Sequence, residues 1–242
     1  MVPQGNIMKK KRQGKFIVID GNEGSGKTTQ LNLLADGLRS EGVSVRTFDF
    51  PQYDQITGQT IKKFLNGEFG TLDDVPPELI TFVYAADRVA AAQDISQALE
   101  EGDIVLANRY VSSNLAHQSG RLPENEQDKF IEWDMQLEYG SLRLPREDEL
   151  IYLFVPHKVS QDLMQNVDRQ NRPYLKGKQV DMVEGDERYL SGSEKAYLRL
   201  SEKFNHWNKI ICVDENGNMR GREDIYREIR AVLEEKGIFP VQ

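Results

Sequence analysis

The chain has 242 residues, of which 38% are hydrophobic and 29% are charged, a balance typical of a globular protein and not of a disordered one. Its net charge of -8 argues against a general duplex-DNA or RNA binder, because such proteins usually carry a basic surface. The single cysteine, Cys212, cannot form an internal disulfide, which favours a reducing, cytoplasmic setting. No apolar run approaches the roughly 18 residues that span a bilayer. We therefore expect neither nucleic acid nor a membrane as a partner.

The first residues, 1–13, are polar and basic and are predicted to form a flexible tail. The apolar run that follows Lys15 is interrupted by Asp20, which makes it too short for a secretory signal. Residues 14–242 have the length of one α/β domain of ordinary size, and no repeat or low-complexity linker divides them.

Apolar segments alternate with helix-length segments along this domain. Strands are predicted at 15–20, 43–50, 103–110, 149–155 and 209–214. Helices are predicted at 27–41, 57–66, 76–101, 124–139, 158–167, 191–207 and 222–236. This alternation predicts a three-layer α/β/α sandwich, in which helices cover both faces of a mainly five-stranded parallel sheet.

Residues 168–190 fit this alternation poorly, because they are polar and lack a clear period. Arg169 and Arg172 lie in their first half. A loop of this length inside a compact domain is usually a functional lid or a disordered excursion, and we favour a mobile lid.

A glycine-rich loop follows the first predicted strand. Residues 21–28, GNEGSGKT, match the pattern G-x-x-x-x-G-K-[ST] in full and precede an amphipathic helix, as in a P-loop NTPase. Backbone N–H groups and a helix N-terminus are expected to bind phosphate there. Lys27 is expected to bridge the β- and γ-phosphates of ATP, and Thr28 to offer its hydroxyl to Mg²⁺, held otherwise by phosphates and water. The alternative is a tight turn with an exposed lysine. The predicted ATP-binding residues are Gly21, Asn22, Glu23, Gly24, Ser25, Gly26, Lys27, Thr28 and Thr29.

Other segments indicate a second ligand. Arg109 falls near the end of a predicted strand, where ligands lie in open parallel sheets. An arginine there can hold a phosphate with two parallel hydrogen bonds, although an ion pair with a nearby carboxylate is an equally good account. Tyr84 and Arg88 lie four residues apart on one predicted helix, which suits stacking on a base and bonding to its edge. Taken alone, Tyr84 would be a core or rim aromatic. The apolar face of that helix runs through Leu79, Phe82, Val83, Ala86, Val89 and Ala90.

Three segments, FIVIDGNEGSGKTTQ, FVYAADR and VLANRYVSSNLAHQ, together resemble thymidylate kinase, a nucleoside-monophosphate kinase family of the P-loop class. The likeness extends from residue 15 to about residue 214. It implies a homodimer that transfers the γ-phosphoryl group of ATP, with Mg²⁺, to dTMP and forms dTDP and ADP.

The resemblance also implies roles for single residues. Glu23 matches an acidic residue near the 3′-hydroxyl of the acceptor deoxyribose. Tyr84 takes the place of a phenylalanine that stacks on thymine, and Arg88 that of an arginine that bonds the base edge. Arg109 matches the arginine that holds the acceptor phosphate. The implied acceptor site is completed by Phe50 in a Phe-Pro pair, Tyr53, Ser113 and Asn114.

Several positions depart from the family pattern. Asn108 replaces the usual aspartate before Arg109, so it brings no charge to a magnesium shell or to the arginine. Tyr53 stands where members with the Phe-Pro pair usually carry an arginine, and Tyr84 adds a hydroxyl that needs a partner. Gly24 occupies the place of a catalytic arginine found in some members.

Because Gly24 brings no charge, the resemblance places the catalytic arginine in the lid. Arg172 and Arg169 are therefore expected to act beside Lys27 and Arg109, although both lid arginines could simply be solvated. Residues 181–184, DMVE, resemble a D-R-x-E motif of the family's lid, with methionine in place of arginine. Two alternatives stay open: a kinase for another deoxynucleotide or deoxynucleoside, and a nucleotide-binding regulatory switch with weak transfer.

Overall fold

The computed structural model describes residues 14–165 and 181–239, so the predicted tail, 1–13, lies outside the described residues. The five strands of the sheet are β1 (Lys15–Gly21), β2 (Val45–Asp49), β3 (Ile104–Asn108), β4 (Glu149–Phe154) and β5 (Trp207–Ile211). Their order is β2-β3-β1-β4-β5, and every neighbouring pair is parallel. The predicted five-stranded parallel sheet is confirmed, with strand ends shifted by a few residues.

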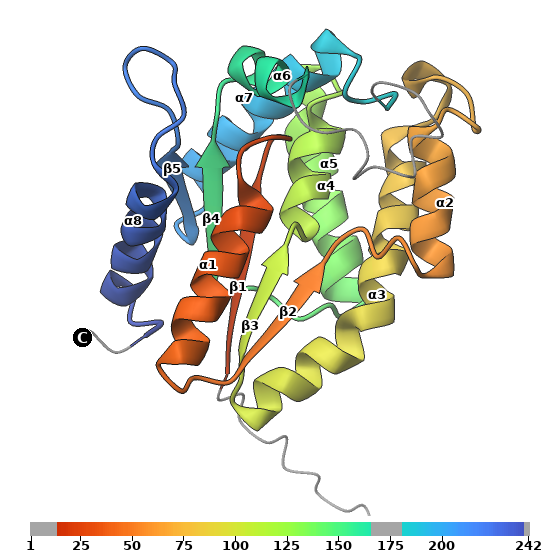
Figure 1. Cartoon of the computed structure of the whole chain (residues 1–242). Helices are drawn as coiled ribbons and strands as arrows, with labels where there is room; N and C mark the ends of the chain where they lie inside the picture. The colour runs from red at the N-terminus through yellow and green to blue at the C-terminus, as the bar shows by residue number, and fades with distance from the viewer. Residues whose placement is uncertain (1–13, 166–180, 240–242) are drawn as a thin grey trace, which may run out of the picture.

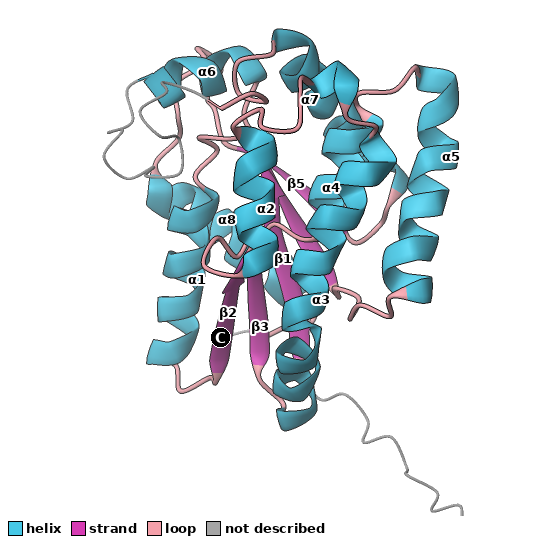
Figure 2. Cartoon of the chain, turned by 90° about the vertical axis from the view of Figure 1, so that its right-hand side faces the viewer, coloured by secondary structure: helices cyan, strands magenta, loops and turns pink. Residues whose placement is uncertain are grey.

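Helices cover both faces of this sheet, as Figures 1 and 2 show. On one face lie α1 (Lys27–Ser40) and α8 (Arg222–Glu235), and on the other lie α3 (Pro77–Glu101), α4 (Val111–Ser119), α5 (Glu124–Met135) and α7 (Glu187–Lys203). The remaining helices are α2 (Ile56–Leu65), which packs on α3, and α6 (His157–Gln165), which contacts α7. The three-layer sandwich is therefore confirmed.

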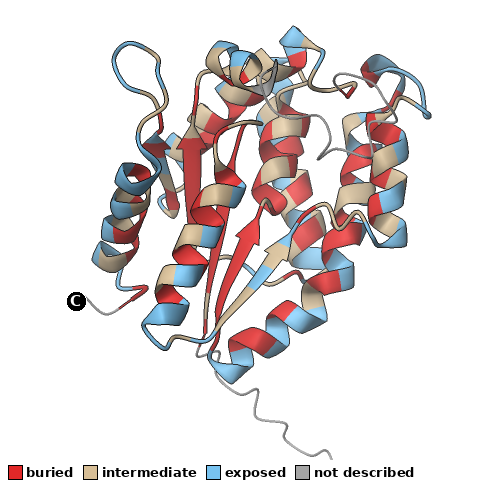
Figure 3. Ribbon diagram, viewed as in Figure 1, coloured by how far each residue is buried: buried red, intermediate tan, exposed pale blue. Residues whose placement is uncertain are grey.

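The central strand explains why both faces are covered. Ile17 and Ile19 of β1 belong to the core beneath α1 and α8, while Phe16 and Val18 belong to the core beneath α3, α4 and α7. All four side chains are fully buried (Figure 3), as expected for a parallel strand that alternates between two apolar layers.

Several element boundaries differ from the predictions. Helix α4 was not predicted, because it is buried on most sides and so shows no amphipathic period. The predicted helix 124–139 ends as α5 at Met135 and continues as a π-helical turn, Gln136–Ser141. Helix α7 begins at Glu187, inside the predicted lid, because the side chain of Asp186 caps it by accepting a hydrogen bond from Tyr189 N at 3.0 Å.

Helix α3 is apolar on two faces. Its buried side includes Ile80, Ala91 and Ile95, together with polar groups that face the site. Most of the stripe identified from the sequence faces solvent instead: Leu79, Phe82 and Val89 are 59%, 49% and 41% exposed, whereas Val83 packs on the core cluster beside α2. Figure 3 shows this outer side of α3 as largely exposed. None of the helices in the described ranges combines the length and hydropathy needed to cross a membrane.

Because all five strands run the same way, their carboxyl ends meet at one edge of the sheet. There β1 leads into the glycine-rich loop, β2 into Phe50 and β3 into Arg109. The peptide bond between Phe50 and Pro51 is cis. The fold thus gathers the predicted site residues from distant parts of the chain.

Candidate active site

The loop after β1 has the geometry of a phosphate-binding turn. Gly26 precedes α1 with a φ of 89°, in the left-handed region that other residues rarely adopt. At Gly21 an added Cβ atom would lie 2.4 Å from the carbonyl oxygen of Leu153, so this approach to β4 requires glycine. The loop opens into a cavity, here named the phosphate cavity. Its lining from this segment is Glu23, Gly24, Ser25, Gly26, Lys27, Thr28 and Thr29.

Lys27 is folded back onto this loop. Its Nζ donates hydrogen bonds to the carbonyl oxygens of Gly21 at 3.0 Å and of Asn22 at 2.8 Å. Burial, reinforced by the nearby charge of Arg109, lowers the pKa of Lys27 to about 8. The side chain of Asn22 turns away from the phosphate cavity, since its Nδ2 donates to Val155 O at 3.3 Å. Gly21 and Asn22 therefore shape the loop through their backbone.

A second cavity, here named the acceptor cavity, lies on the other side of Arg109. The structure brings together in its wall every residue predicted for the acceptor nucleotide: Glu23, Phe50, Tyr53, Tyr84, Arg88, Arg109, Ser113 and Asn114. These side chains come from the glycine-rich loop, the segment after β2, α3, the end of β3 and α4. The predicted residues therefore line one common cavity.

The two cavities share one wall. The residues that line both are Glu23, Phe50, Pro51, Tyr53 and Arg109. Arg109 is the cation of this set, and its backbone has a φ of 63°, a conformation that costs a non-glycine residue roughly 1 kcal/mol. Its backbone N–H donates to Ile19 O at 3.0 Å, which fixes the strained turn to β1. The side chain is thereby held between the two cavities.

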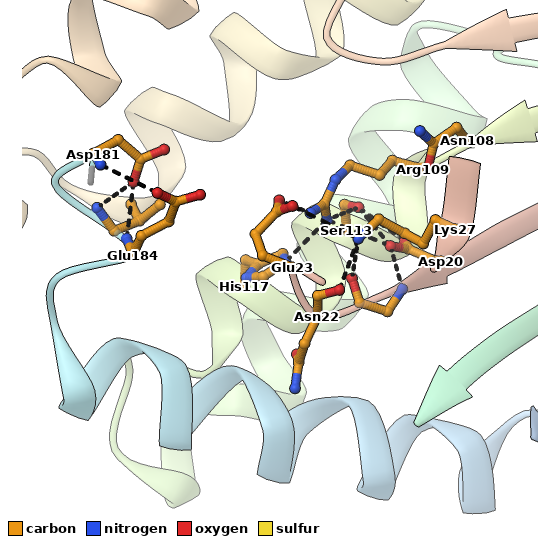
Figure 4. A network of polar contacts seen from close by, with 12 residues as sticks. Asp20, Asn22, Glu23, Lys27, Asn108, Arg109, Ser113, His117, Asp181 and Glu184 are labelled. Carbon is orange, nitrogen blue, oxygen red and sulfur yellow. Dashed lines mark hydrogen bonds and ion pairs between the residues drawn. The ribbon is translucent and has the colours of Figure 1, made fainter. Parts of the chain in front are cut away.

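Carboxylates surround Arg109, as the ion-pair alternative anticipated (Figure 4). Its Nη2 donates to Glu23 Oε1, and its Nη1 lies 3.5 Å from Asp20 Oδ1. The two carboxylates differ in exposure: the side chain of Asp20 is fully buried, whereas that of Glu23 is 39% exposed. Asp20 is therefore a fixed support for the guanidinium, whereas Glu23 is the more exposed partner and also lies 3.9 Å from Lys27 Nζ.

Asp20 was not identified from the sequence, yet it organises the site. Its carboxylate accepts hydrogen bonds from Ser112 Oγ at 2.5 Å, Ser113 Oγ at 2.8 Å and Tyr197 Oη at 2.9 Å. It also accepts from Gly21 N at 2.8 Å. One buried carboxylate thus links β1, the first turn of α4 and α7, and only the assembled fold reveals that role.

Arg88 is held rigidly at the far end of the acceptor cavity. Its Nε and Nη2 donate to Glu138 at 2.6 and 2.5 Å, and its Nη1 donates to Tyr110 O at 3.2 Å. The same glutamate accepts from Asn114 Nδ2 at 2.9 Å. The nearby charge of Glu138 outweighs burial and raises the pKa of Arg88, so the guanidinium stays charged in a buried place. The guanidinium therefore has a fixed orientation in the wall of the acceptor cavity.

Three further cavity residues were missed as site residues. Asp87 holds the segment after β2, because it accepts from Gln52 N at 2.8 Å and from Thr57 Oγ1 at 2.6 Å. His117 Nε2 lies 3.3 Å from Arg109 Nη1, and burial lowers the pKa of His117 to about 3, so the ring is neutral and can accept. Gln118 of α4 completes this side of the wall. The spacing of His117 on an unpredicted helix gave no signal for this contact.

The segment 181–190 covers the acceptor cavity and comes from the second half of the predicted lid. It begins with a turn in which Asp181 Oδ1 accepts from Val183 N at 3.0 Å and Glu184 N at 2.8 Å. Burial and the neighbouring Glu184 raise the pKa of Asp181 to about 7. Met182 N donates to Leu65 O at 3.0 Å, which ties this turn to α2. Arg169 and Arg172, the predicted lid arginines, lie outside the described residues.

Ligands for a metal ion are few on the protein side. No group of three or more His, Cys, Asp or Glu side chains in the described ranges could hold one. Thr28, Asp49 and Asn108 all line the phosphate cavity. A Mg²⁺ ion there would depend mainly on oxygen atoms of a bound nucleotide and water.

Comparisons with known proteins agree on one family. The model of the thymidylate kinase family matches residues 19–217. A thymidylate kinase of Mycobacterium tuberculosis is 35% identical over 58% of this chain, but the match spans only 65% of that relative. A probable thymidylate kinase of Thermococcus gammatolerans is 30% identical over 92% of this chain and 97% of the relative. The solved thymidylate kinase of Candida albicans has the same fold, with a TM-score of 0.68 at 16% identity over 93% of each chain.

Proposed function

Since the chain belongs to the thymidylate kinase family, we propose that it carries out the known reaction of that family, transfer of the γ-phosphoryl group of ATP to dTMP. The products are ADP and dTDP. The observation that carries the proposal is the wall between the two cavities, in which Arg109 faces both. This arrangement places the donor and acceptor phosphates beside one cation, which suits a reaction that depends on positioning and charge neutralisation.

ATP binds through the glycine-rich loop. Its β- and γ-phosphates accept hydrogen bonds from the backbone N–H groups at the N-terminus of α1. Lys27 then donates to phosphate oxygens instead of the carbonyl oxygens of Gly21 and Asn22. Thr28 and neighbouring oxygen atoms suit Mg²⁺, which prefers oxygen ligands and neutralises phosphate charge when bound.

The acceptor nucleotide lies in the acceptor cavity with its phosphate toward Arg109. Asp20 keeps the guanidinium in place from the buried side, and the acceptor phosphate replaces the more exposed carboxylate of Glu23. Glu23 is then available to the 3′-hydroxyl of the deoxyribose. Tyr84 stacks on the base, and Arg88, fixed by Glu138, bonds its edge. Arg109 therefore aims the attacking phosphate oxygen at the γ-phosphorus.

Water has to be kept from the γ-phosphate, because hydrolysis competes with transfer. The turn at 181–184 already covers the acceptor cavity, and residues 168–180 precede it in the chain. We assign Arg169 and Arg172 to the transferring phosphoryl group on this ground and on the family resemblance. In this assignment the two arginines supply the positive charge that the glycine-rich loop lacks at Gly24.

The reaction is tested by product analysis with ATP and a panel of acceptors: dTMP, dUMP and thymidine. Equal amounts of ADP and dTDP from dTMP, with little ADP when no acceptor is present, support the proposal. Faster phosphorylation of thymidine than of dTMP would show a nucleoside kinase instead. ADP formed only when a protein partner is added would show a regulatory switch.

The outer stripe of α3 is proposed as the homodimer interface. The exposed apolar side chains of this stripe, at helical spacing, are Leu79, Phe82 and Val89. A contiguous apolar patch on the surface of a protein often marks an interface with another protein. The variant Phe82→Glu is expected to convert a dimer into a monomer in light-scattering measurements. Phe69→Glu is the matched control, because Phe69 is similarly exposed, at 46%, but lies off the stripe. A dimer that survives Phe82→Glu would exclude this interface.

The unpaired Cys212 supports a cytoplasmic setting for the enzyme.

A further inference from the structure

Two neighbouring strands end beside the glycine-rich loop with an unusual pair of side chains. Asp49 ends β2 and Asn108 ends β3, and the two residues stand directly opposite each other in the parallel register. The Nδ2 group of Asn108 donates to Asp49 Oδ1 at 2.8 Å and contacts Thr28 Oγ1 at 3.3 Å. The side chains of Thr28, Asp49 and Asn108 therefore gather in the wall of the phosphate cavity.

The amide of Asn108 is incompletely satisfied. The residue is only 9% exposed, and its Oδ1 is buried with no hydrogen-bond partner among the described residues. An unmatched buried acceptor is costly, about 1–3 kcal/mol, and such atoms often belong to a ligand site. Because Nδ2 is directed to Asp49 and Thr28, the carbonyl oxygen is the atom of this amide that remains available.

Asp49 supplies a negative charge beside Thr28 and Asn108 that can offset a divalent cation. Asn108 is neutral and Thr28 is neutral, so neither offsets a divalent cation. The Asp49 carboxylate makes its hydrogen bond to an amide, and no direct ion pair neutralises it among the described residues. Lys27 and Arg109 act on it only from a distance, since Lys27 donates to the loop carbonyls and Arg109 to Glu23.

From this geometry and the proposed function, we propose that Asp49 supplies the acidic oxygen of the Mg²⁺–nucleotide shell. Thr28 contributes its hydroxyl, and Asn108 acts as the positioning residue that holds the carboxylate at this corner. Mg²⁺ is usually bound by one or two carboxylates together with nucleotide phosphates and water, and this donor set meets that pattern. The carboxylate therefore comes from β2, while the neighbouring strand β3 supplies its tether.

The test measures metal binding, not turnover. Mn²⁺ serves as the probe, and its affinity for the complex of protein and ADP is measured by electron paramagnetic resonance. The change Asp49→Asn keeps the shape and removes the charge, and we expect it to weaken Mn²⁺ binding at least about tenfold. Asp94→Asn, at an exposed position on α3, removes one charge away from the site and is expected to change nothing.

The same variant is then titrated with ADP in EDTA. Without metal, Asp49 and the phosphates repel each other, so Asp49→Asn is expected to bind ADP as tightly as the wild type or more tightly. Opposite responses with and without metal distinguish a ligand role from a structural one. Equal weakening in both conditions, or unchanged Mn²⁺ affinity, would overturn the proposal.

A double variant tests whether weaker Mn²⁺ binding by Asp49→Asn comes from the lost charge or from a folding defect. Asp49→Asn/Asn108→Asp exchanges the acid and the amide across the two strands, so the hydrogen-bonded pair is retained with one negative charge at the same corner. We expect its Mn²⁺ affinity to return to within about threefold of the wild type, as for a conserved ligand charge. Failure of the exchange to restore binding in a folded protein counts against Asp49. Neither measurement needs an acceptor nucleotide, so a wrong acceptor assignment would leave these results unaffected.

Discussion

The two cavities on either side of Arg109 are built in different ways. The phosphate cavity is formed largely by one continuous segment, residues 21–29, whose backbone conformation supplies the binding groups. The acceptor cavity is formed by side chains from several elements, and buried carboxylates hold its cations: Asp20 beside Arg109, and Glu138 beside Arg88. A backbone site depends on a short local pattern, whereas a side-chain site depends on supports that lie far away in the sequence.

The largest effect is expected for a substitution of Arg109 in the wall that the two cavities share. Arg109→Ala is expected to lower the rate of phosphoryl transfer at least about 10³-fold, because the acceptor phosphate loses its orienting cation. The affinity for ATP is expected to stay within about threefold of the wild type, since the loop backbone is intact. Steady-state kinetics and nucleotide titration measure the two quantities. Arg199→Ala, which removes an arginine bonded to Gln127 and Asp128 away from both cavities, is the control. Near-normal turnover in Arg109→Ala would remove this residue from its role.

A smaller effect, on the free energy of unfolding, is expected to differ between Asp20, which supports the acceptor cavity, and Ser25 of the glycine-rich loop. Asp20→Ala leaves the hydroxyls of Ser112, Ser113 and Tyr197 without their acceptor, so we expect a loss of about 3 kcal/mol in the free energy of unfolding. Ser25→Ala changes a buried hydroxyl that has no hydrogen-bond partner among the described residues, and its expected cost is below about 1 kcal/mol. Denaturant unfolding of both variants gives these values. Similar losses for the two would show that the carboxylate does not organise the site.

These supports also mark the limit of what the sequence could predict. The glycine-rich loop, the five strands and the acceptor residues Tyr84, Arg88 and Arg109 could be identified, because each belongs to a local pattern or to segments that resemble a family. Asp20 and Glu138 could not, since their importance comes from hydrogen bonds to residues far away in the chain. Local context alone cannot predict such contacts.

Helices α3 and α4 show the same limit in the fold. The sequence predicted α3 and its apolar stripe, but periodicity does not say whether an apolar face meets the core or a partner. Here the stripe with Phe82 is exposed, and the buried side carries Asp87 and Arg88 toward the cavity. Helix α4 buries polar residues such as Ser112, Asn114 and Gln118 beside apolar ones, so its sequence shows no separate apolar and polar faces. Burial by tertiary structure overrode the local signal in both cases.

A smaller effect is expected for the base-binding end of the acceptor cavity. Tyr84→Ala removes a stacking surface worth about 1–3 kcal/mol, so the KM for dTMP is expected to rise about tenfold or more. Tyr84→Phe keeps the ring and is expected to change that KM less than about threefold. The KM for ATP serves as the internal control in both variants. A large effect of Tyr84→Phe would show that the hydroxyl, and not the ring, makes the important contact.

The smallest effect concerns pH in the phosphate cavity. The pKa of Lys27 is about 8 in the protein, and bound phosphates raise it because negative charge favours the ammonium. Binding therefore takes up protons near pH 8, and ATP affinity is highest below pH 8 and falls as pH rises through this value. The fall is at most about tenfold per pH unit. Titration calorimetry in buffers of different ionisation enthalpy measures the uptake. Lys27→Arg, whose charge does not titrate there, is expected to bind with a flat profile.

The most direct test of the shared wall is a binding cycle with dTMP and thymidine, which differ only by the acceptor phosphate. Calorimetry on the wild type and on Arg109→Ala gives four affinities. The variant is expected to lose about 10- to 100-fold in affinity for dTMP, as expected for charged hydrogen bonds, and almost nothing for thymidine. Equal losses for both ligands, or no loss for dTMP, would contradict it, because Arg109 would then not hold the phosphate.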